Sequence, residues 1–493
     1  MAAQTRSSLS TLSFKKAAPA ALLPGILCLA ALLASCAPVG PNFTPPHPPT
    51  EKSYTPQKEL LTPAQHLSLG RQLKRDWWRL YASEALNSTI EQALKNNYSL
   101  AAARQTLAAT EESIAVAHGG MLPQVSLNGQ IARQKYGVAM FGPSNFKIPP
   151  FNAYEAGPSV SWTLDLFGGQ RREIERQKAL AQYQYYKLDA AYVELTGNVV
   201  AEALDIAAAK AEMGTVLKII GEDKKTLHLV ETAYKAGAET KVGVLAAKSQ
   251  LENNRALLPP LRQRINVAQH ALAILAGKPP GGWTPPSFTL QSLMLPQDLP
   301  VALPSQMAHD RPDILAAEAN LHAASAAVGV ATADMYPRIT LSATTLQEAL
   351  VPGQLFNGTA NAWNMIGGIS APIFNGGALS AQKRAAADAY NAALAEYRQT
   401  VLDAFGQVAD ALTGLDHDNE LVSAQQRAYN TAHAALRLTR KSYQAGETNL
   451  LRVQDSERQL AEAELGLIRA QSRRYQDTAK LFVALARAPV TRY

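Results

Sequence analysis

The sequence PSVSWTLDLFGG, residues 158–169, decides the fold class, because a strand pattern ends in it and a helix pattern begins after it. Val160 and Trp162 alternate with serine and threonine, the period-two pattern of a strand with one apolar and one polar face. After Gly169 the next proline is Pro259. A helix that fills most of this interval, at about 1.5 Å per residue, would be roughly 95 Å long. The sequence therefore predicts a mixed α and β fold with unusually long helices.

The same order of segments occurs twice, at an offset of roughly 210 residues, which indicates an internal duplication. Three pairs of segments match in the same order: Met121-Leu122-Pro123-Gln124 with Met335-Tyr336-Pro337-Arg338, Leu166-Phe167-Gly168-Gly169 with Phe374-Asn375-Gly376-Gly377, and Tyr234-Lys235-Ala236-Gly237 with Tyr443-Gln444-Ala445-Gly446. We therefore predict two internal structural repeats, at 64–279 and 312–489. A linker at 280–311 joins them, and a tail at 490–493 follows.

Each repeat is predicted to contain a leading helix, two strands, a very long helix, a glycine turn and a returning helix. The leading helices are expected at about 84–119 and 312–334. The four strands are expected at about 123–136, 154–167, 337–346 and 363–374. The long helices are expected at about 170–235, 240–277, 377–445 and 448–487. Pro259-Pro260 interrupts the returning helix of the first repeat, whereas the second repeat has Leu467-Ile468 there, so the repeats are not interchangeable.

Residues 1–35 have the pattern of a lipoprotein signal peptide. A basic segment precedes an apolar run, which ends in Leu33-Ala34-Ser35-Cys36 and resembles a bacterial lipobox. A retained membrane anchor is the alternative, but Pro24-Gly25 shortens the apolar run below the roughly 20 residues of a span. We expect diacylglycerol and an N-acyl chain on Cys36, which would hold the chain at a membrane. Ala37, in place of an aspartate, favours sorting to the outer membrane.

The segment that follows the lipobox, residues 36–63, is rich in proline and is expected to be a lipidated, extended tether. Removal of the leader lowers the number of Lys and Arg residues from 47 to 44 against 40 Asp and Glu, a net charge of +4. This charge is too small to indicate a nucleic-acid partner. The two cysteines both lie near the N-terminus, so no disulfide framework, metal site or cofactor is expected.

Four amphipathic strands in one chain need lipid or a core for their apolar faces and partners for their edges. Roughly eight strands are the fewest that close a transmembrane barrel, so one chain cannot close it. Several identical chains could each supply four strands, with the polar faces turned to a water-filled lumen. The long helices would then continue as a tunnel below the membrane. A soluble β-sandwich with helical arms is the alternative, which the glycine-rich strand ends fit less well.

Four short segments carry a resemblance to a known family: Val39-Gly40-Pro41-Asn42-Phe43, Trp77-Trp78, Arg311-Pro312-Asp313-Ile314 and Pro372-Ile373-Phe374-Asn375-Gly376-Gly377. The chain resembles the TolC-like outer-membrane factors, in particular the NodT family of efflux lipoproteins, from about Cys36 to Ala488. The resemblance implies a homotrimer with a twelve-stranded transmembrane β-barrel and a long periplasmic α-helical barrel. It also implies two partners, a periplasmic membrane-fusion adaptor and an inner-membrane pump of the RND, MFS or ABC type.

The glycine turns between the long helices are the first candidate sites. Glycine favours the left-handed conformation that ends helices, and the resemblance places both turns at the periplasmic tip, where the adaptor docks. The predicted docking residues are Gly237, Ala238, Glu239, Thr240, Gly446, Glu447, Thr448 and Asn449. The alternative is that these residues only form hairpin turns.

A periplasmic gate is the second candidate site. Asp455 matches a family position at which acidic residues surround the closed aperture, while Arg452 stands where some relatives have a second acid. A carboxylate in contact with solvent is the alternative for Asp455. Arg311, Pro312 and Asp313 are interpreted as a structural motif, because Pro312 suits the first turn of a helix and either Asp310 or Asp313 can cap it.

The leading functional hypothesis is a passive exit duct for drugs or small solutes, without catalytic activity. The first alternative has the same architecture and is an exit duct for protein or polysaccharide secretion of a type I kind. The second alternative comes from another class, a structural envelope lipoprotein or cell-wall enzyme without a transport role.

Overall fold

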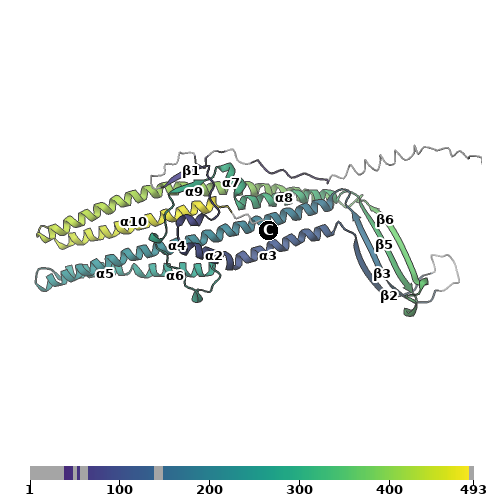
Figure 1. The fold of residues 1–493 in the computed structure, drawn as a ribbon, viewed down its shortest axis with the longest axis horizontal. Coiled ribbons are helices and arrows are strands. Elements are labelled where there is room, and N and C mark those ends of the chain that lie inside the picture. The colour runs from purple at the N-terminus through teal and green to yellow at the C-terminus, as the bar shows by residue number, and fades with distance from the viewer. Residues whose placement is uncertain (1–37, 48–50, 52, 56–64, 138–147, 488–493) are drawn as a thin grey trace, which may run out of the picture. The chain divides into compact units, whose positions relative to one another are not determined.

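The computed structural model describes residues 38–47, 51, 53–55, 65–137 and 148–487 (Figure 1). The predicted signal peptide, Cys36 and the tail at 490–493 lie outside the described residues. The helices and strands along the chain are β1 His66–Leu69, η1 Trp77–Tyr81, α2 Glu84–Asn96, α3 Tyr98–Gly119, β2 Gln124–Gln134, β3 Phe151–Leu164, α4 Gly169–Lys235, α5 Lys241–Arg255, α6 Leu258–Leu275, η3 Pro280–Gly282, η4 Leu290–Ser292, β4 Asp298–Val301, α7 Pro304–Asp310, α8 Pro312–Ala333, β5 Arg338–Ala349, η5 Pro352–Gln354, η6 Gly358–Ala360, β6 Asn361–Ser370, α9 Ala378–Gln444 and α10 Leu450–Leu485.

The chain forms two compact units, and each unit draws residues from both sequence repeats. The sheet unit contains the described residues of 38–41, 118–173 and 326–384, and so includes β2, β3, β5 and β6. The helical unit contains those of 42–117, 174–325 and 385–487. The repeats in the sequence are therefore not the compact units of the fold, because corresponding strands of both repeats pair in one sheet.

The four strands of the sheet unit form an antiparallel sheet in the order β2-β3-β5-β6. One row across its polar face is Ser126, Ser159, Thr344 and Asn364, and the next row, on the opposite face, is Val125, Val160, Ala343 and Met365. Neighbouring rows point to opposite faces because side chains alternate along a strand. The sheet therefore has one polar and one apolar face, as the alternation in the sequence predicts. The last strand ends at Ser370, so the prediction of a strand to residue 374 is wrong at that end.

The two longest helices, α4 and α9, have 67 residues each. The corresponding returning helices differ, because α10 has 36 uninterrupted residues whereas the first repeat returns as α5 and α6. The predicted interruption of the returning helix at 240–277 is therefore confirmed, although it begins a few residues before Pro259. The break falls at Ala256 and Leu257, directly before α6. The second and third residues of α6 are Pro259 and Pro260, which have no N–H groups to donate to the preceding turn.

The leading helix predicted at 84–119 is also two helices, α2 and α3, which Asn97 separates. The side-chain oxygen of Asn97 accepts a hydrogen bond from the N–H of Leu100 at 3.0 Å, and thereby caps α3. Its amide group donates to the carbonyl oxygen of Leu275 at 3.0 Å, at the end of α6. An asparagine that serves both helix ends therefore creates a break that helix propensity alone does not indicate.

The predicted linker at 280–311 is structured and covers the core of the helical unit. β4 pairs in parallel with β1, so that Leu67 lies opposite Leu299. In the core, Trp77, Tyr81 and Phe482 pack with Phe288, and all four are fully buried or nearly so. The segment between the repeats therefore also has a structural part, because its apolar residues supply one side of an aromatic core.

The described part of the predicted tether is docked and does not extend freely. In the sheet unit, the N–H of Val39 donates to the carbonyl oxygen of Phe167 at 3.0 Å, and Nε of the buried Arg172 donates to the carbonyl oxygen of Val39 at 3.1 Å. Gly40 has a φ of +91°, and a Cβ there would lie 2.6 Å from Cα of Gly329. Hydrogen bonds and close packing therefore fix the described start of the predicted tether, from Pro38 to Gly40, to the sheet unit.

Within the described ranges, α8 is the helix that is long and apolar enough to cross a membrane, which the sequence patterns did not indicate. Half of the most apolar stretch of this helix is buried inside the chain. Ile314 and Leu321 of this helix belong to the core of the helical unit. The composition of α8 therefore agrees with that of a packed helix rich in alanine.

Candidate functional site

The two hairpin turns of the helical unit have the same construction. Gly237 and Gly446 end α4 and α9 with φ of +76° and +77°, the left-handed conformation that the sequence predicts there. The next residue of each turn, Ala238 or Glu447, donates its N–H to a carbonyl oxygen five residues earlier, at 2.9 Å in both turns. These bonds satisfy carbonyl groups that a helix end leaves without partners.

The returning helices begin with matching caps. Oγ1 of Thr240 accepts a hydrogen bond from the N–H of Gly243 at 3.1 Å, and Oδ1 of Asn449 accepts one from the N–H of Arg452 at 3.1 Å. Glu239 and Thr448 are half-buried between glycine and cap, while Glu447 is exposed. The predicted docking residues therefore form two rigid turns of similar shape, whose role in docking stays a prediction.

The tips of the two hairpins pack against each other. Val230 and Val244 of the first hairpin form a small buried cluster with Leu450, the first residue of α10. A few residues further along α10, Glu457 accepts hydrogen bonds from Thr226 of α4 at 3.2 Å and from Arg440 of α9 at 2.8 Å. The two turns are therefore held together by apolar packing and by one shared carboxylate.

Asp455 has partners on its own helix. Its carboxylate accepts hydrogen bonds from Nη2 of Arg458 at 2.7 Å and from Nε2 of Gln459 at 3.0 Å. Its side chain is 44% exposed, so solvent screens this ion pair and its contribution to stability is small. Asp455 and Arg452, the two predicted gate residues, lie within the first turns of α10, and their role as a gate stays a prediction.

Arg311 connects three helices in the helical unit. Its guanidinium donates to both carboxylate oxygens of Asp313, at 2.9 to 3.1 Å, and to the carbonyl oxygen of Ala484 at 3.0 Å. A further, longer bond reaches the carbonyl oxygen of Ala404 in α9. Pro312 is the first residue of α8. This geometry agrees with the interpretation of the three residues as a structural motif, because the buried Arg311 joins the start of α8 to α9 and α10.

Ion pairs also join the helices of the two repeats, and sequence reasoning missed them. Glu212 of α4 is buried and accepts hydrogen bonds from Arg264 of α6 at 3.3 Å and from Arg469 of α10 at 2.9 Å. Further along α4, Lys218 donates to Glu464 of α10 at 2.8 Å. Charges at helical spacing were the available signal, but the sequence does not show which neighbouring helix they face.

A second group that sequence reasoning missed is the carboxyl pair Asp418 and Asp477, on α9 and α10. Both are almost fully buried. Nε of Arg473 lies 3.0 Å from Asp418, and Nζ of Lys480 lies 2.7 Å from Asp477. Burial, together with the hydrogen bond and negative charge of Asp477, raises the pKa of Asp418 to about 7. This pair therefore holds a proton at pH values where ordinary carboxyl groups have lost theirs.

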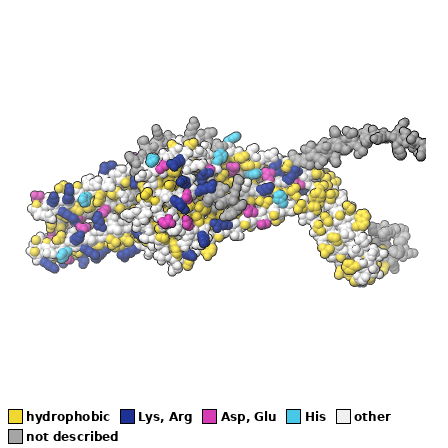
Figure 2. Space-filling model, viewed as in Figure 1, with side chains coloured by type: hydrophobic (Ala, Val, Ile, Leu, Met, Phe, Trp, Pro, Cys, Tyr) yellow, Lys and Arg dark blue, Asp and Glu magenta, His cyan; other side chains and the backbone are white. Residues whose placement is uncertain are grey.

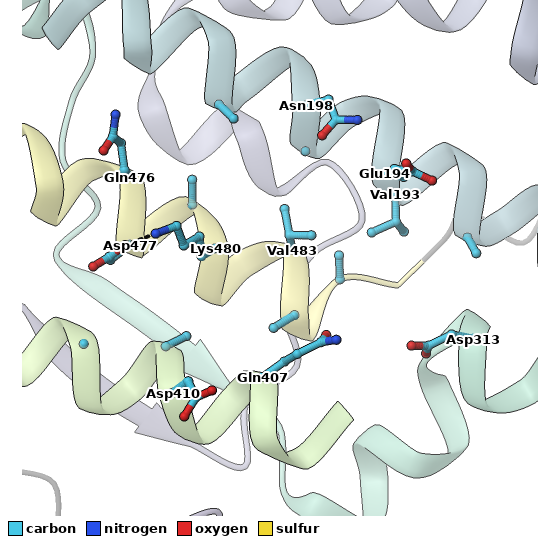
Figure 3. Close-up of a pocket in the computed structure, with 18 of the residues that line it drawn as sticks. Val193, Glu194, Asn198, Asp313, Gln407, Asp410, Gln476, Asp477, Lys480 and Val483 are labelled. Carbon is cyan, nitrogen blue, oxygen red and sulfur yellow. Dashed lines mark hydrogen bonds and ion pairs between the residues drawn. The ribbon is translucent and has the colours of Figure 1, made fainter. Parts of the chain in front are cut away.

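A cavity of about 930 Å³ lies between α4, α9, α10 and the start of α8 (Figure 3). Along α10, Gln476, Lys480 and Val483 line it, and their spacing of three to four residues places them on one face of the helix. The neighbouring residues Leu481 and Phe482 are buried in the aromatic core. The cavity and the aromatic core therefore lie on different faces of α10.

The apolar face of the sheet carries large exposed side chains. Val125, Leu127 and Ile131 of β2 are 72%, 81% and 78% exposed, and the exposed Trp363 and Met365 of β6 lie on the same face. Figure 2 shows hydrophobic side chains over the strands, whereas charged side chains gather over the helices. An exposed apolar face of this extent marks a surface in contact with lipid or a partner. Together with the paired long helices, it is the combination that the sequence predicts for a channel-forming protein of the outer membrane.

Comparison with known proteins assigns the family. The family model of the outer membrane efflux proteins matches residues 89–278 and 303–487, so the chain belongs to this family. Its members are the outer-membrane channels of tripartite efflux systems, in which an adaptor and an inner-membrane pump are the partners. The resemblance to TolC-like factors is thereby confirmed, and the efflux channel is favoured over the structural envelope lipoprotein.

Three relatives illustrate the similarity. The chain is 30% identical to the pyoverdine export outer membrane protein OpmQ of Pseudomonas aeruginosa over 437 residues, 86% of this chain and 91% of that protein. It is 28% identical to the cation efflux system protein CusC of Escherichia coli K12 over 475 residues, 95% of this chain and 99% of that protein. The solved structure of the outer-membrane channel OprN is similar with a TM-score of 0.84 and 27% identity, over 92% of this chain and 99% of that one.

Proposed function

We propose that three copies of this chain close a twelve-stranded barrel in the outer membrane, and that their long helices form a passive exit duct for drugs or small solutes. The single observation that carries this proposal is the open, amphipathic sheet. Within the described residues, β2 and β6 are its edges, and each has a strand partner on one side only. Unpaired edges inside a membrane are unfavourable, because lipid cannot satisfy their N–H and C=O groups.

The strand directions support closure by identical copies. The four strands alternate in direction, so the first edge, β2, runs opposite to the last edge, β6. In a ring of identical chains, β6 of one copy can therefore pair in antiparallel fashion with β2 of the next. The polar row that contains Ser126 and Asn364 would face the lumen, and the apolar row that contains Val125 and Met365 would face lipid.

The lipid on Cys36 would act as a second membrane attachment. Cys36 precedes the first described residue, Pro38, by two positions. Metabolic labelling with palmitate tests this modification, and the Cys36→Ser variant is expected to lose the label.

The hairpin tips are the proposed docking surface for the periplasmic adaptor. The turns at Gly237 and Gly446 are similar in shape, since the same bonds and caps fix them, and a trimer would present six such turns at one end. Asp455, close to the second turn, would surround the closed aperture with Arg452. The inner-membrane pump would be of the RND, MFS or ABC type.

A deletion strain tests the function as a small-solute duct. Cells that lack the gene are expected to accumulate a fluorescent efflux substrate, and the wild-type gene restores its export. A Gly446→Pro variant, in which the second turn cannot form, is expected to restore none, because proline cannot adopt the positive φ of this position. Normal accumulation in the deletion strain, together with a loss of secreted protein, would favour the secretion duct instead.

A further inference from the structure

The cavity beside α10 is lined by both apolar and charged side chains. Apolar side chains make up much of its wall, among them Ala190, Ala201 and Val483. Figure 3 shows Glu194 and Asn198 on α4, and Gln407 and Asp410 on α9, on opposite sides of Val483 and Lys480 of α10. The cavity therefore combines an apolar wall with polar and charged groups on both sides.

Most of the charges in the wall are already neutralised. Arg311 pairs with Asp313, Lys480 pairs with Asp477, and Arg473 lies between the two buried carboxyl groups. Asp205 is likewise paired, with Arg264. Each positively charged residue that lines the wall, within the part of the chain that the structure describes, therefore lies next to at least one carboxyl group.

Three carboxylates of the wall have no ion pair within the described part of the chain. They are Glu194 and Glu202 on α4 and Asp410 on α9. Glu194 and Asp410 are exposed, and Glu202 is half-buried. The cavity therefore presents an excess of negative charge next to apolar surface. Its volume of about 930 Å³ falls within the range of pockets that hold drug-sized molecules.

The position of the cavity fits contact with the transported solute. It lies on a face of α10 away from the aromatic core, which η1 and the segment around Phe288 cover. In the proposed duct, those covering elements lie outside the helical wall, because they would obstruct a lumen. The face that holds the cavity would then be turned toward the lumen.

We propose that this cavity is a binding site for organic cations with an apolar body, such as quaternary phosphonium ions or amphiphilic amines, in the wall of the duct. The apolar wall would receive the body of the solute, and Glu194, Glu202 and Asp410 would attract its charge. This inference rests on the proposed function and adds the class of solute that the wall selects. Organic anions of the same shape would be repelled by the same three carboxylates.

Two probe ions of nearly equal shape and opposite charge test the site. Tetraphenylphosphonium and tetraphenylborate are dialysed to equilibrium against the purified, detergent-solubilised protein. We expect saturable binding of the phosphonium ion, at least about tenfold tighter than binding of the borate ion. Equal binding of both ions, or tighter binding of the borate ion, would overturn the proposal.

Variants assign the binding to the cavity. Glu194→Gln combined with Asp410→Asn is expected to weaken phosphonium binding about fivefold, because each partly solvated charge contributes modestly. Ala201→Trp fills the cavity from an exposed position and is expected to abolish binding. Glu231→Gln, an exposed carboxylate on the same helix outside the cavity, is the matched control and should leave binding unchanged.

Two further measurements keep this inference separate from the proposed function. Circular dichroism shows whether each variant is folded, and phosphonium binding that persists in a folded Ala201→Trp protein would place the ion elsewhere and overturn the assignment. The mass of the oligomer and its conductance in a planar bilayer test the duct itself. Because one chain forms the whole cavity, a conducting oligomer without charge-selective binding would refute the site alone.

Discussion

The two helical hairpins of this chain begin alike and return differently. α4 and α9 have the same length of 67 residues and end in the same glycine turn. α10 returns without a break, whereas α5 and α6 are separated ahead of two prolines. Among the described residues, only the unbroken helix has ion pairs with both long helices, through Glu464 to α4 and through Glu457 to α9. The comparison indicates that α10, the returning helix of the second hairpin, is the central element of the helical unit.

The largest expected effect comes from a break in α10 like the one in the first hairpin. Ile468→Pro removes a helical hydrogen bond in the interior of α10 and is expected to cost about 3 kcal/mol or more. We expect loss of the folded protein, measured as helicity by circular dichroism and as the yield of the oligomer. The matched control, Pro259→Ala with Pro260→Ala, is expected to retain both. A stable Ile468→Pro protein would contradict the central position of α10.

Removal of the buried guanidinium of Arg311, which contacts the end of α10, is expected to have the next largest effect. Arg311→Ala leaves the carbonyl group of Ala484 without its donor and removes the partner of Asp313. The expected loss is about 2 to 3 kcal/mol, which thermal unfolding would report as a lower Tm. Arg311→Lys should restore little, since one ammonium group cannot reproduce the two-pronged bond to Asp313. An unchanged Tm for Arg311→Ala would show that this contact does not fix α10.

The carboxyl pair between α9 and α10 is expected to make stability depend on pH. Burial and Asp477 raise the pKa of Asp418 from 3.8 to about 7, so the folded state retains a proton that the unfolded state has lost. Stability therefore falls as pH rises from about 4 to 7. Asp418→Asn mimics the protonated group and is expected to raise Tm by a few degrees at pH 8 and hardly at all at pH 4.

The half-exposed carboxyl group of Asp416, on the same helix, provides the control for this pH dependence. Asp416→Asn is expected to leave the difference in Tm between pH 4 and pH 8 as it is in the wild type. If Asp418→Asn retains that full difference as well, the pH dependence has another origin.

The smallest expected effect concerns the proposed gate at Asp455. At this position the tips of the two hairpins differ. Asp455 follows Gly446 by nine residues, and the corresponding residue of the first hairpin is Ala246. If three Asp455 carboxylates retain cations at the aperture, Asp455→Ala is expected to raise single-channel cation conductance, because ions leave a weaker site faster. Glu252→Ala, on the first returning helix, is the control. Unchanged conductance and selectivity in Asp455→Ala would reject the gate.

Local patterns were sufficient to predict the two longest helices, the turns and the alternation of the strands. The absence of proline after Gly169 and the glycines at 237 and 446 act within a few residues, so the sequence displays them directly. The cap at Asn97 was missed because asparagine also occurs inside helices, and its second partner, Leu275, is distant in the sequence. The docking of Pro38 to Gly40 escaped the prediction for the same reason, since Arg172 supplies the contact.

The sites show the same division between local and distant information. The glycine turns and the proline at 312 are local and could be assigned to residues in advance. The pair Asp418 and Asp477, and the cavity with Glu194 and Asp410, combine helices that are far apart in the sequence. Charge spacing along one helix shows that a face is polar, but packing decides which charges meet across two helices.

The central claim is that one chain holds only part of a membrane barrel, whose open edges β2 and β6 are closed by further copies. Native mass spectrometry of the protein purified from outer membranes in mild detergent tests this most directly. We expect a particle of three chains that withstands dilution in the detergent. A particle of one chain, stable without detergent in water, would contradict the claim.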